Sequence, residues 1–369
     1  ISIDLEKVKI YEDKTKSTTP LVDVTDIFLG FDLWTIINGK MEIKDIKLKN
    51  GSLNLVQHID GEFNITKALS SEKEVEDPNE EFHLDLKEIE LENIDLTKLN
   101  EENNILVDAL IYDADAKFTT SPHHIYTKLD AKFELNLIQD GDTTFIKHKH
   151  LDVNTSFDLY DETNILTIDP TVVKLEGSEF NMEGTIDVLH DMLLDLKFFG
   201  NKKDFSLVMA MAPEELIPTL KKYDNKGKIY FDATVKGKSI NHHNPAIEAT
   251  FKCEDAYFDN TVVDKKLDQL NFVGHFTNGE KRDPSTMEFT LNDFTARPEV
   301  GIIKADLSLK NFDKPDIKLK LNTDFKLELS NILAIALDLR DLIISKPLKT
   351  SVLLIFFKGT TSQTVPSAT

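Results

Sequence analysis

The sequence contains one cysteine, one tryptophan and no apolar run long enough to cross a bilayer. The lone Cys253 excludes a disulfide within the chain, and its place in an alternating apolar run indicates an inert buried thiol. The apolar run 352–357 is far shorter than the ~20 residues of a membrane-spanning helix, and we interpret it as a terminal strand. No signal-peptide pattern is visible, and the chain begins with Ile1 instead of methionine. We therefore expect a piece of a longer protein, with any membrane anchor outside this sequence.

Positive charge is also scarce. The chain has 43 Lys and Arg against 65 Asp and Glu, which gives a formal net charge of −22 and a pI of about 4.9. This balance argues against a nucleic-acid partner, because such binding depends on Lys and Arg that neutralise phosphates. It also argues against electrostatic docking on an anionic membrane surface. With 40% hydrophobic and 29% charged residues, the composition is that of a folded globular chain.

The familiar catalytic signatures are missing. The sequence has no P-loop, dinucleotide-binding, nucleophile-elbow, zinc-protease or paired-cysteine pattern. His148 and His150 would share one face of a strand, which is compatible with a metal, but they are flanked by Lys with no carboxylate at a fixed spacing. We interpret them as surface histidines and predict no metal, no cofactor and no catalytic residue. A hydrolytic β protein is the weakest of three functional readings, since it would need convergent carboxylates or histidines.

The chain is organised around residues 41–65, where apolar residues alternate with polar ones in pairs. Such alternation predicts strands with one apolar face. Its phase changes between successive pairs, and a β-bulge or a sharp bend at Lys44-Asp45 would keep both pairs on one side. Asn50-Gly51 and Asp60-Gly61 then predict two turns, so we expect strand, turn, strand, turn, strand. Residues 84–96 repeat the paired pattern.

Short alternating strands continue over 109–188 and 229–321, which predicts antiparallel β structure. Turns are expected at residues 161–164, Asp169-Pro170 and Glu176-Gly177. Helices are expected at 28–37, 212–222 and 329–344. Pattern alone favours two sheets packed face to face, with the apolar stripe as an ordinary core. The alternative is one curved sheet whose apolar face stays partly open as a groove for lipid chains. The 23 Phe against 7 Tyr suit a dry surface.

Several segments resemble AsmA-like proteins of Gram-negative envelopes. The first resemblance combines the apolar segment 33–39 with a spaced set of residues after it, and further segments at 227–237, 244–249 and 303–329 resemble the family's later modules. The spaced set is Ile43, Ile46, Leu48, Gly51, Leu53, Leu55, Asp60, Gly61 and Asn64. The acidic insert 70–81 and the tail after Lys346 match nothing in the family pattern.

The resemblance implies a mainly β fold: an elongated, curved antiparallel sheet that forms a half-open apolar groove, with a few short helices. This fold is related to TamB-type and chorein-type bridge-like lipid-transfer proteins. On this basis we divide the chain into an amino-terminal β region (1–69) without its anchor helix, an acidic loop (70–81), a central β region (82–211), a carboxy-terminal β region (212–345) and a tail (346–369).

The function implied is non-enzymatic: to bind or conduct phospholipid along the groove in support of outer-membrane lipid homeostasis. The protein would be anchored in the inner membrane through the missing helix and project into the periplasm. Its partners would be acyl chains, that membrane and periplasmic or outer-membrane proteins. The alternative is a structural assembly factor with a closed β core. The expected lipid-contacting residues are Ile43, Ile46, Leu48, Leu53, Leu55, Ile229, Phe231, Ala233, Val235, Ile247, Ala249 and Phe251.

Overall fold

The computed structural model describes residues 1–13, 17–32, 43–70, 86–101, 104–121, 123–139, 142–143, 147–160, 162–187, 193–211, 217–239, 243–260, 265–299, 301–314 and 316–324. The chain divides into two compact units. The first comprises Ile1–Glu179 and Glu183–Met192, and the second Phe180–Met182 and Leu193–Thr369. Their division falls inside the region 82–211 that the sequence analysis treats as one. The acidic insert, apart from Ser70, and the segments 329–344 and 352–357 lie outside the described residues.

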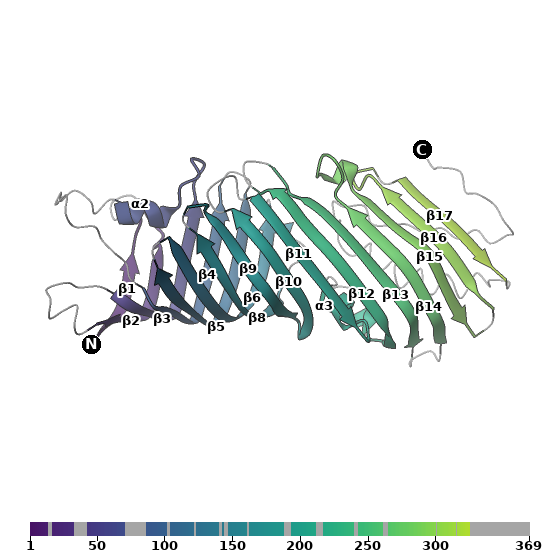
Figure 1. Ribbon diagram of the computed structural model, residues 1–369, viewed down its shortest axis with the longest axis horizontal. Coiled ribbons are helices and arrows are strands. Elements are labelled where there is room, and N and C mark those ends of the chain that lie inside the picture. Colours follow the sequence, from purple (N-terminus) through teal and green to yellow (C-terminus); the bar gives the residue numbers. More distant parts are fainter. Residues whose placement is uncertain are drawn as a thin grey trace. The chain divides into compact units, whose positions relative to one another are not determined.

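Successive strands of the first unit lie next to one another in sequence order (Figure 1). Its elements are β1 (Ser2–Ile10), β2 (Val22–Phe31), β3 (Ile43–Gln57), α2 (Asn64–Ser70), β4 (Glu88–Asn100), β5 (Ile105–Ser121), β6 (His124–Gln139), β7 (Asp142–Thr143), β8 (Lys149–Tyr160) and β9 (Ile165–Leu175). All described pairings within it are antiparallel except β3 with β4, which is parallel. β10 (Ser178–Asp187) contributes residues to both units.

The second unit repeats the meander with antiparallel pairs throughout its described strands. Its elements are β11 (Leu193–Lys202), α3 (Ser206–Met211), α4 (Ile217–Leu220), β12 (Tyr223–Lys238), β13 (Ala246–Asn260), β14 (Lys265–Thr277), the 3-10 helix η1 (Pro284–Thr286), β15 (Glu288–Pro298), β16 (Ile303–Lys310) and β17 (Asp316–Thr323).

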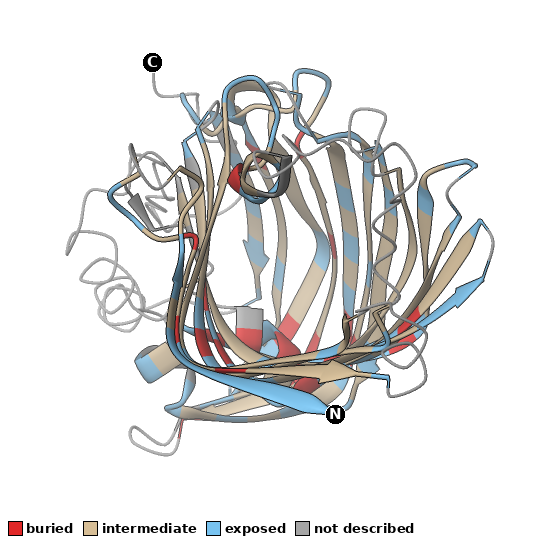
Figure 2. Ribbon diagram, turned by 90° about the vertical axis from the view of Figure 1, so that its left-hand side faces the viewer, coloured by how far each residue is buried: buried red, intermediate tan, exposed pale blue. Residues whose placement is uncertain are grey.

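The mainly β, curved and open fold is confirmed for each unit, and the interpretation as two face-to-face sheets is wrong. In the described residues no pairing joins β1 to β9 or β11 to β17, so the sheet stays open within each unit. Buried residues form only short stretches of the strands, most of which are partly or fully exposed (Figure 2). No described helix combines the length and apolar character that crossing a membrane requires.

Two local irregularities produce the paired alternation of the first unit: a bulge, and a pair of residues with positive φ. In the β2–β3 register, Gly30 pairs with Asp45 and Phe31 with Ile43, so Lys44 is the extra residue, as predicted. A second phase change falls at Asn50 in β3 and Asn93 in β4, both with positive φ, and the Asn93 amide donates to Asn50 Oδ1 at 3.2 Å. The register does not shift there, since Lys49 pairs with Glu92 and Gly51 with Ile94, so the positive φ at both asparagines turns the next apolar pair to the same face. Apolar residues from both sides of this level therefore form one cluster, which includes Ile27, Leu48, Leu53, Leu91, Ile94 and Leu96.

The predicted turn at Asn50-Gly51 is wrong, because both residues lie inside the continuous strand β3. A Cβ on Gly51 would lie 2.1 Å from the carbonyl oxygen of Asp23, so glycine here permits close packing of strands. The turn at Asp169-Pro170 is also wrong, since these residues continue β9 across a register shift. The turn before Ile165 is confirmed by the bond from Asn164 N to Tyr160 O (2.7 Å).

Glu176 and Gly177 form the predicted tight turn, with φ of 49° and 78° between β9 and β10.

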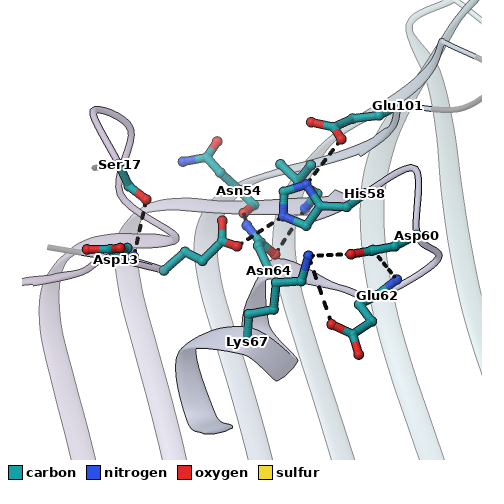
Figure 3. A network of polar contacts seen from close by, with 11 residues as sticks. Asp13, Ser17, Asn54, His58, Asp60, Glu62, Asn64, Lys67 and Glu101 are labelled. Carbon is teal, nitrogen blue, oxygen red and sulfur yellow. Dashed lines mark hydrogen bonds and ion pairs between the residues drawn. The ribbon is translucent and has the colours of Figure 1, made fainter. Parts of the chain in front are cut away.

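The turn at Asp60-Gly61 is confirmed, but a helix follows it instead of the expected third strand. Figure 3 shows the polar contacts that build this corner. The side chain of Asn64, only 5% exposed, accepts from Val56 N (3.0 Å) and donates to Asn54 O (2.8 Å). It therefore takes the place of a neighbouring strand where β3 extends beyond β2. Nearby, His58 lies between Glu12 and Glu101, at 3.1 Å from each.

Two helix predictions need correction. Residues 28–31 belong to β2 instead of a helix, with Phe28 on the polar side beneath Lys49 Nζ (6.0 Å from its ring centre). The helix expected at 212–222 is represented by α4, while a second helix, α3, precedes it. Residues 33–37 and 212–216 lie outside the described residues.

Candidate functional site

One face of the second unit's sheet is apolar across β11 to β17. Side chains alternate along each strand, and the antiparallel registers place apolar residues opposite one another on the same side. We call this the apolar face. Its members include Leu196, Phe198, Ile229, Phe231, Ala233, Val235, Ile247, Ala249, Phe251, Cys253, Phe272, Phe276, Phe289, Leu291, Ala305, Leu307, Leu309, Leu319 and Leu321.

The structure brings together all the residues of β12 and β13 that the sequence analysis selected. The register pairs Phe231 with Phe251, Ala233 with Ala249, and Val235 with Ile247. Ile229 joins them opposite Cys253. Only Ile229 is buried (6% exposed), and the other selected residues are partly exposed although they are apolar.

Glycines under the aromatic rings allow this face to pack closely. A Cβ on Gly274 would lie 2.0 Å from Phe251 Cε2, and one on Gly200 would lie 2.4 Å from Phe231 Cε1. Each phenylalanine ring therefore rests over a glycine of the neighbouring strand. Phe251 also stacks on Phe289, with ring centres 5.8 Å apart. Phe has no polar atom, so these rings make a surface without hydrogen-bonding groups.

One end of the apolar face is covered and the rest is open. Phe205, at the start of α3, packs on a buried cluster and its ring centre lies 4.5 Å from that of Phe258. We call this cluster the covered section: Ile229, Cys253, Ala256, Leu270 and Ala296, each at most 6% exposed. We give the name open section to these partly exposed residues of the face: Phe231, Ala233, Val235, Ile247, Ala249, Phe251, Phe276, Phe289, Leu291, Leu307 and Leu319.

Polar contacts fix α3 at its place. Asn225 Oδ1 accepts from Phe205 N at 3.0 Å, and Asp204 Oδ1 accepts from Ser206 N at 2.9 Å. Hydrogen bonds from the Ser206 hydroxyl and backbone N–H hold the pKa of Asp204 below its usual value, because the ionised carboxylate is the better acceptor. Below the helix, burial raises the pKa of the Cys253 thiol to about 12, so this thiol stays protonated and inert.

The opposite face of the same sheet is charged. Ion pairs cross between neighbouring strands, among them Lys197–Asp232 at 3.2 Å and Lys236–Asp195 at 2.9 Å. Glu288 pairs with Lys310 at 2.8 Å in the same way. These exposed pairs contribute little to stability, but they mark this face as the one turned to water.

The first unit carries an apolar face of its own. Ile43, Ile46, Leu48 and Leu53 lie opposite Phe31, Leu29, Ile27 and Val22 of β2. Leu55 lies opposite Lys98 of β4, near the end of the strand. Ile94 is fully buried, and its partners on the two neighbouring strands are Gly51 of β3 and Ile111 of β5.

The two histidines considered as metal ligands do approach a common carboxylate. His148 Nδ1 contacts Glu134 Oε1, and His150 Nε2 lies 3.5 Å from Glu134 Oε2. The hydrogen bond from His148 is the largest cause that lowers the pKa of Glu134. Within the described residues, no group of His, Cys, Asp or Glu has a geometry that would hold a metal ion.

A cavity of about 460 Å³ lies in the first unit and has a mixed lining that includes Asp115, Lys117, Leu129 and Asp130. Lys117 Nζ binds Asp115 Oδ2 at 2.6 Å, and Asn154 donates to Asp130 at 2.9 Å. The other oxygen, Asp115 Oδ1, is buried without a hydrogen-bond partner among the described residues, so the polar groups of this cavity satisfy one another only in part.

Sequence reasoning missed α3 and with it the covered section. The stretch 206–211, SLVMAM, is too short and too uniformly apolar to show a helical period. A detectable signal was Asp204 before Ser206, since Asp commonly caps the start of a helix.

No protein-family model, no curated protein and no solved structure matches this chain.

Proposed function

We propose that this protein is a non-enzymatic lipid-binding protein that holds or conducts phospholipid acyl chains along its apolar faces. The observation that carries the proposal is the open section: partly exposed Phe, Leu, Ile, Val and Ala over neighbouring strands, backed by a charged face. A contiguous exposed apolar surface of this kind is typical of a ligand or partner site. With the family resemblance, the proposal extends to phospholipid traffic in a Gram-negative periplasm, from an inner-membrane anchor.

The energetics suit lipid transfer. Removing one methylene from water is worth roughly 0.8 kcal/mol, so a ~16-carbon chain gains up to about 12 kcal/mol on a dry surface. A bilayer already provides most of this gain, and the transfer from bilayer to protein is therefore close to neutral. Because the open section lacks polar side chains, neighbouring positions hold an acyl chain with similar energy. A lipid can then shift along the sheet without having to leave a deep energy minimum.

The first test is native mass spectrometry with lipid extraction on the protein purified without detergent. We expect co-purified phospholipid in more than trace amounts. Protein free of lipid that also takes up no fluorescent phospholipid would overturn the proposal. It would favour the alternative of an assembly factor that acts through protein partners.

A double substitution, Phe231→Asp with Ala249→Asp, places two charges in the open section. We expect lipid capture to fall at least tenfold while the protein stays folded, because a desolvated carboxylate is strongly unfavourable. The matched control, Thr290→Asp with Asn322→Asp, places the same two charges on the opposite face and should leave lipid capture unchanged. Equal capture by both double variants would contradict the assignment of the open section.

A further inference from the structure

A guanidinium group stands at the end of the open section. Phe231, Ala233, Val235 and Gly237 alternate along one side of β12, and Gly237 is the last residue of this row. A Cβ on Gly237 would lie 3.3 Å from Arg282 Nη1 and 3.6 Å from Nη2. The guanidinium of Arg282 therefore occupies the place where a side chain at position 237 would stand. Gly237 has a φ of +112°, which excludes most other residues there.

Hydrogen bonds to backbone carbonyl groups hold Arg282 in this position. Its Nη1 donates to Asn244 O at 2.9 Å, and the Asn244 amide donates back to Arg282 O at 3.2 Å. Its own N–H bonds Gly279 O at 3.3 Å, at a positive φ of 59°. The side chain is thus fixed before any ligand arrives, which reduces the ordering that binding requires.

Arg282 keeps donors for an anion. A guanidinium has five N–H donors, and no carboxylate in the described part of the chain pairs with this one. The neighbouring Asp283 is occupied, since its Oδ1 accepts from Ser285 N (2.9 Å) and Ser285 Oγ (2.6 Å). The charged groups beside Arg282 in sequence are Glu280, Lys281 and Asp283, and Lys281 is exposed.

The distance from Arg282 to α3 suits one layer of acyl chains. From Gly237 to Phe231 is six residues along β12, or about 20 Å at ~3.3 Å per residue. The next residue of the row, Ile229, already belongs to the buried cluster with Phe205, the residue before α3. Half of a ~30 Å bilayer core is about 15 Å. A lipid with its polar group at Arg282 therefore has room for its chains before the covered section.

We propose that Arg282 binds the phosphate of a phospholipid headgroup whose acyl chains lie on the open section. This inference rests on the proposed lipid-binding function and adds an orientation to it: headgroup at the Arg282 end, chain ends toward α3. Arginine matches phosphate oxygens in two parallel hydrogen bonds, which gives directional recognition that the apolar face cannot supply.

The experiment compares two fluorescent lipids with identical acyl chains, phosphatidic acid and diacylglycerol, on the full chain. Arg282→Gln should weaken phosphatidic acid binding about tenfold, in line with the loss of charge-assisted hydrogen bonds, and leave diacylglycerol binding unchanged. Lys281→Gln, which removes an exposed neighbouring charge, should change neither lipid by more than about twofold. Arg282→Lys should fall between wild type and Arg282→Gln, because it keeps the charge without the paired geometry.

Equal weakening of both lipids by Arg282→Gln would show a structural role and overturn the inference, as would no weakening of either. Wild-type protein that binds neither lipid would refute the proposed function itself, whereas tight and equal binding of both would refute the headgroup contact alone. A titration with inorganic phosphate separates the two sources of phosphate. Binding of free phosphate at Arg282 as tight as that of phosphatidic acid would assign a phosphate site and overturn the lipid anchor.

Discussion

Replacing Asn64 by alanine tests how the corner after β3 is built. The Asn64 side chain is almost fully buried and makes two hydrogen bonds to the backbone of β3, one to Val56 N and one to Asn54 O. Asn64→Ala removes the side-chain oxygen and nitrogen that make these bonds, and alanine has no polar side-chain atom to replace them. Each backbone group left unpaired costs about 1 to 3 kcal/mol when water cannot replace the partner.

We take about 2 kcal/mol for the pair, since residues 54–57 are partly exposed and water will hydrate them in part. By the relation of ~1.4 kcal/mol per factor of ten, the local opening constant rises about 30-fold. Native-state hydrogen exchange reads this directly at the Val56 amide. Exchange in β11 and β12 should not change, because no Asn64 contact reaches those strands in the described chain.

Asn64→Asp sharpens the test. Its carboxylate still accepts from Val56 N but places an acceptor against Asn54 O, so we expect exchange at least as fast as in Asn64→Ala. Asn201→Ala, at an exposed position of β11, is the control and should leave Val56 unchanged. If Asn64→Asp protected Val56 as well as the wild type does, the proposed role of the Asn64 amide as donor would be refuted.

Three further outcomes concern the second unit. Cys253 should resist alkylation at mildly alkaline pH in the folded protein and react once unfolded, because its pKa is raised to about 12; fast native labelling would contradict its burial. Gly274→Val should displace the Phe251 ring and lower the free energy of unfolding by about 1 to 3 kcal/mol in urea titrations, and an unchanged midpoint would argue against that packing. Asp204 has a lowered pKa, so it stabilises α3 above its usual carboxyl pKa and this contribution is lost as pH falls through the folded value. Asp204→Ala should remove that part of the pH dependence of hydrogen exchange in α3, and an unaltered profile would contradict it.

Much of the fold follows from the alternation of apolar residues. The phase change before Ile46 predicted a bulge or a sharp bend at Lys44-Asp45, and the register shows the bulge, which keeps successive pairs on one face. The same reasoning did not place Asn50 inside a strand, since Asn-Gly tolerates positive φ in a turn and in a strand alike. What separates a strand from a turn here is the close packing of Gly51 against Val24 of β2, and this contact is not visible in the sequence.

Only part of the candidate site was selected from the sequence, namely its residues in β12 and β13, whereas those of β14 to β17 and the boundaries of the site were not. The register of β12 with β13 follows from matching two apolar runs, so Phe231, Ala249 and their neighbours were selected correctly as one face. The covered section depends on α3, whose six residues carry no helical period, and on a fold-back after β11 that places Phe205 over Ile229. The position of Arg282 over Gly237 depends on a loop geometry with positive φ that no pattern of residues indicated.

Alternation alone does not decide between a sandwich and an open sheet, because both need strands with one apolar face. Connectivity decides it. From β12 to β17 each strand pairs antiparallel with the next one in the chain, so each addition extends the same sheet instead of starting a facing one. The cross-strand pairs such as Lys197–Asp232 keep the other face in water. Each further strand therefore lengthens the open section without changing its chemistry, which is the property that a path for sliding lipid chains requires.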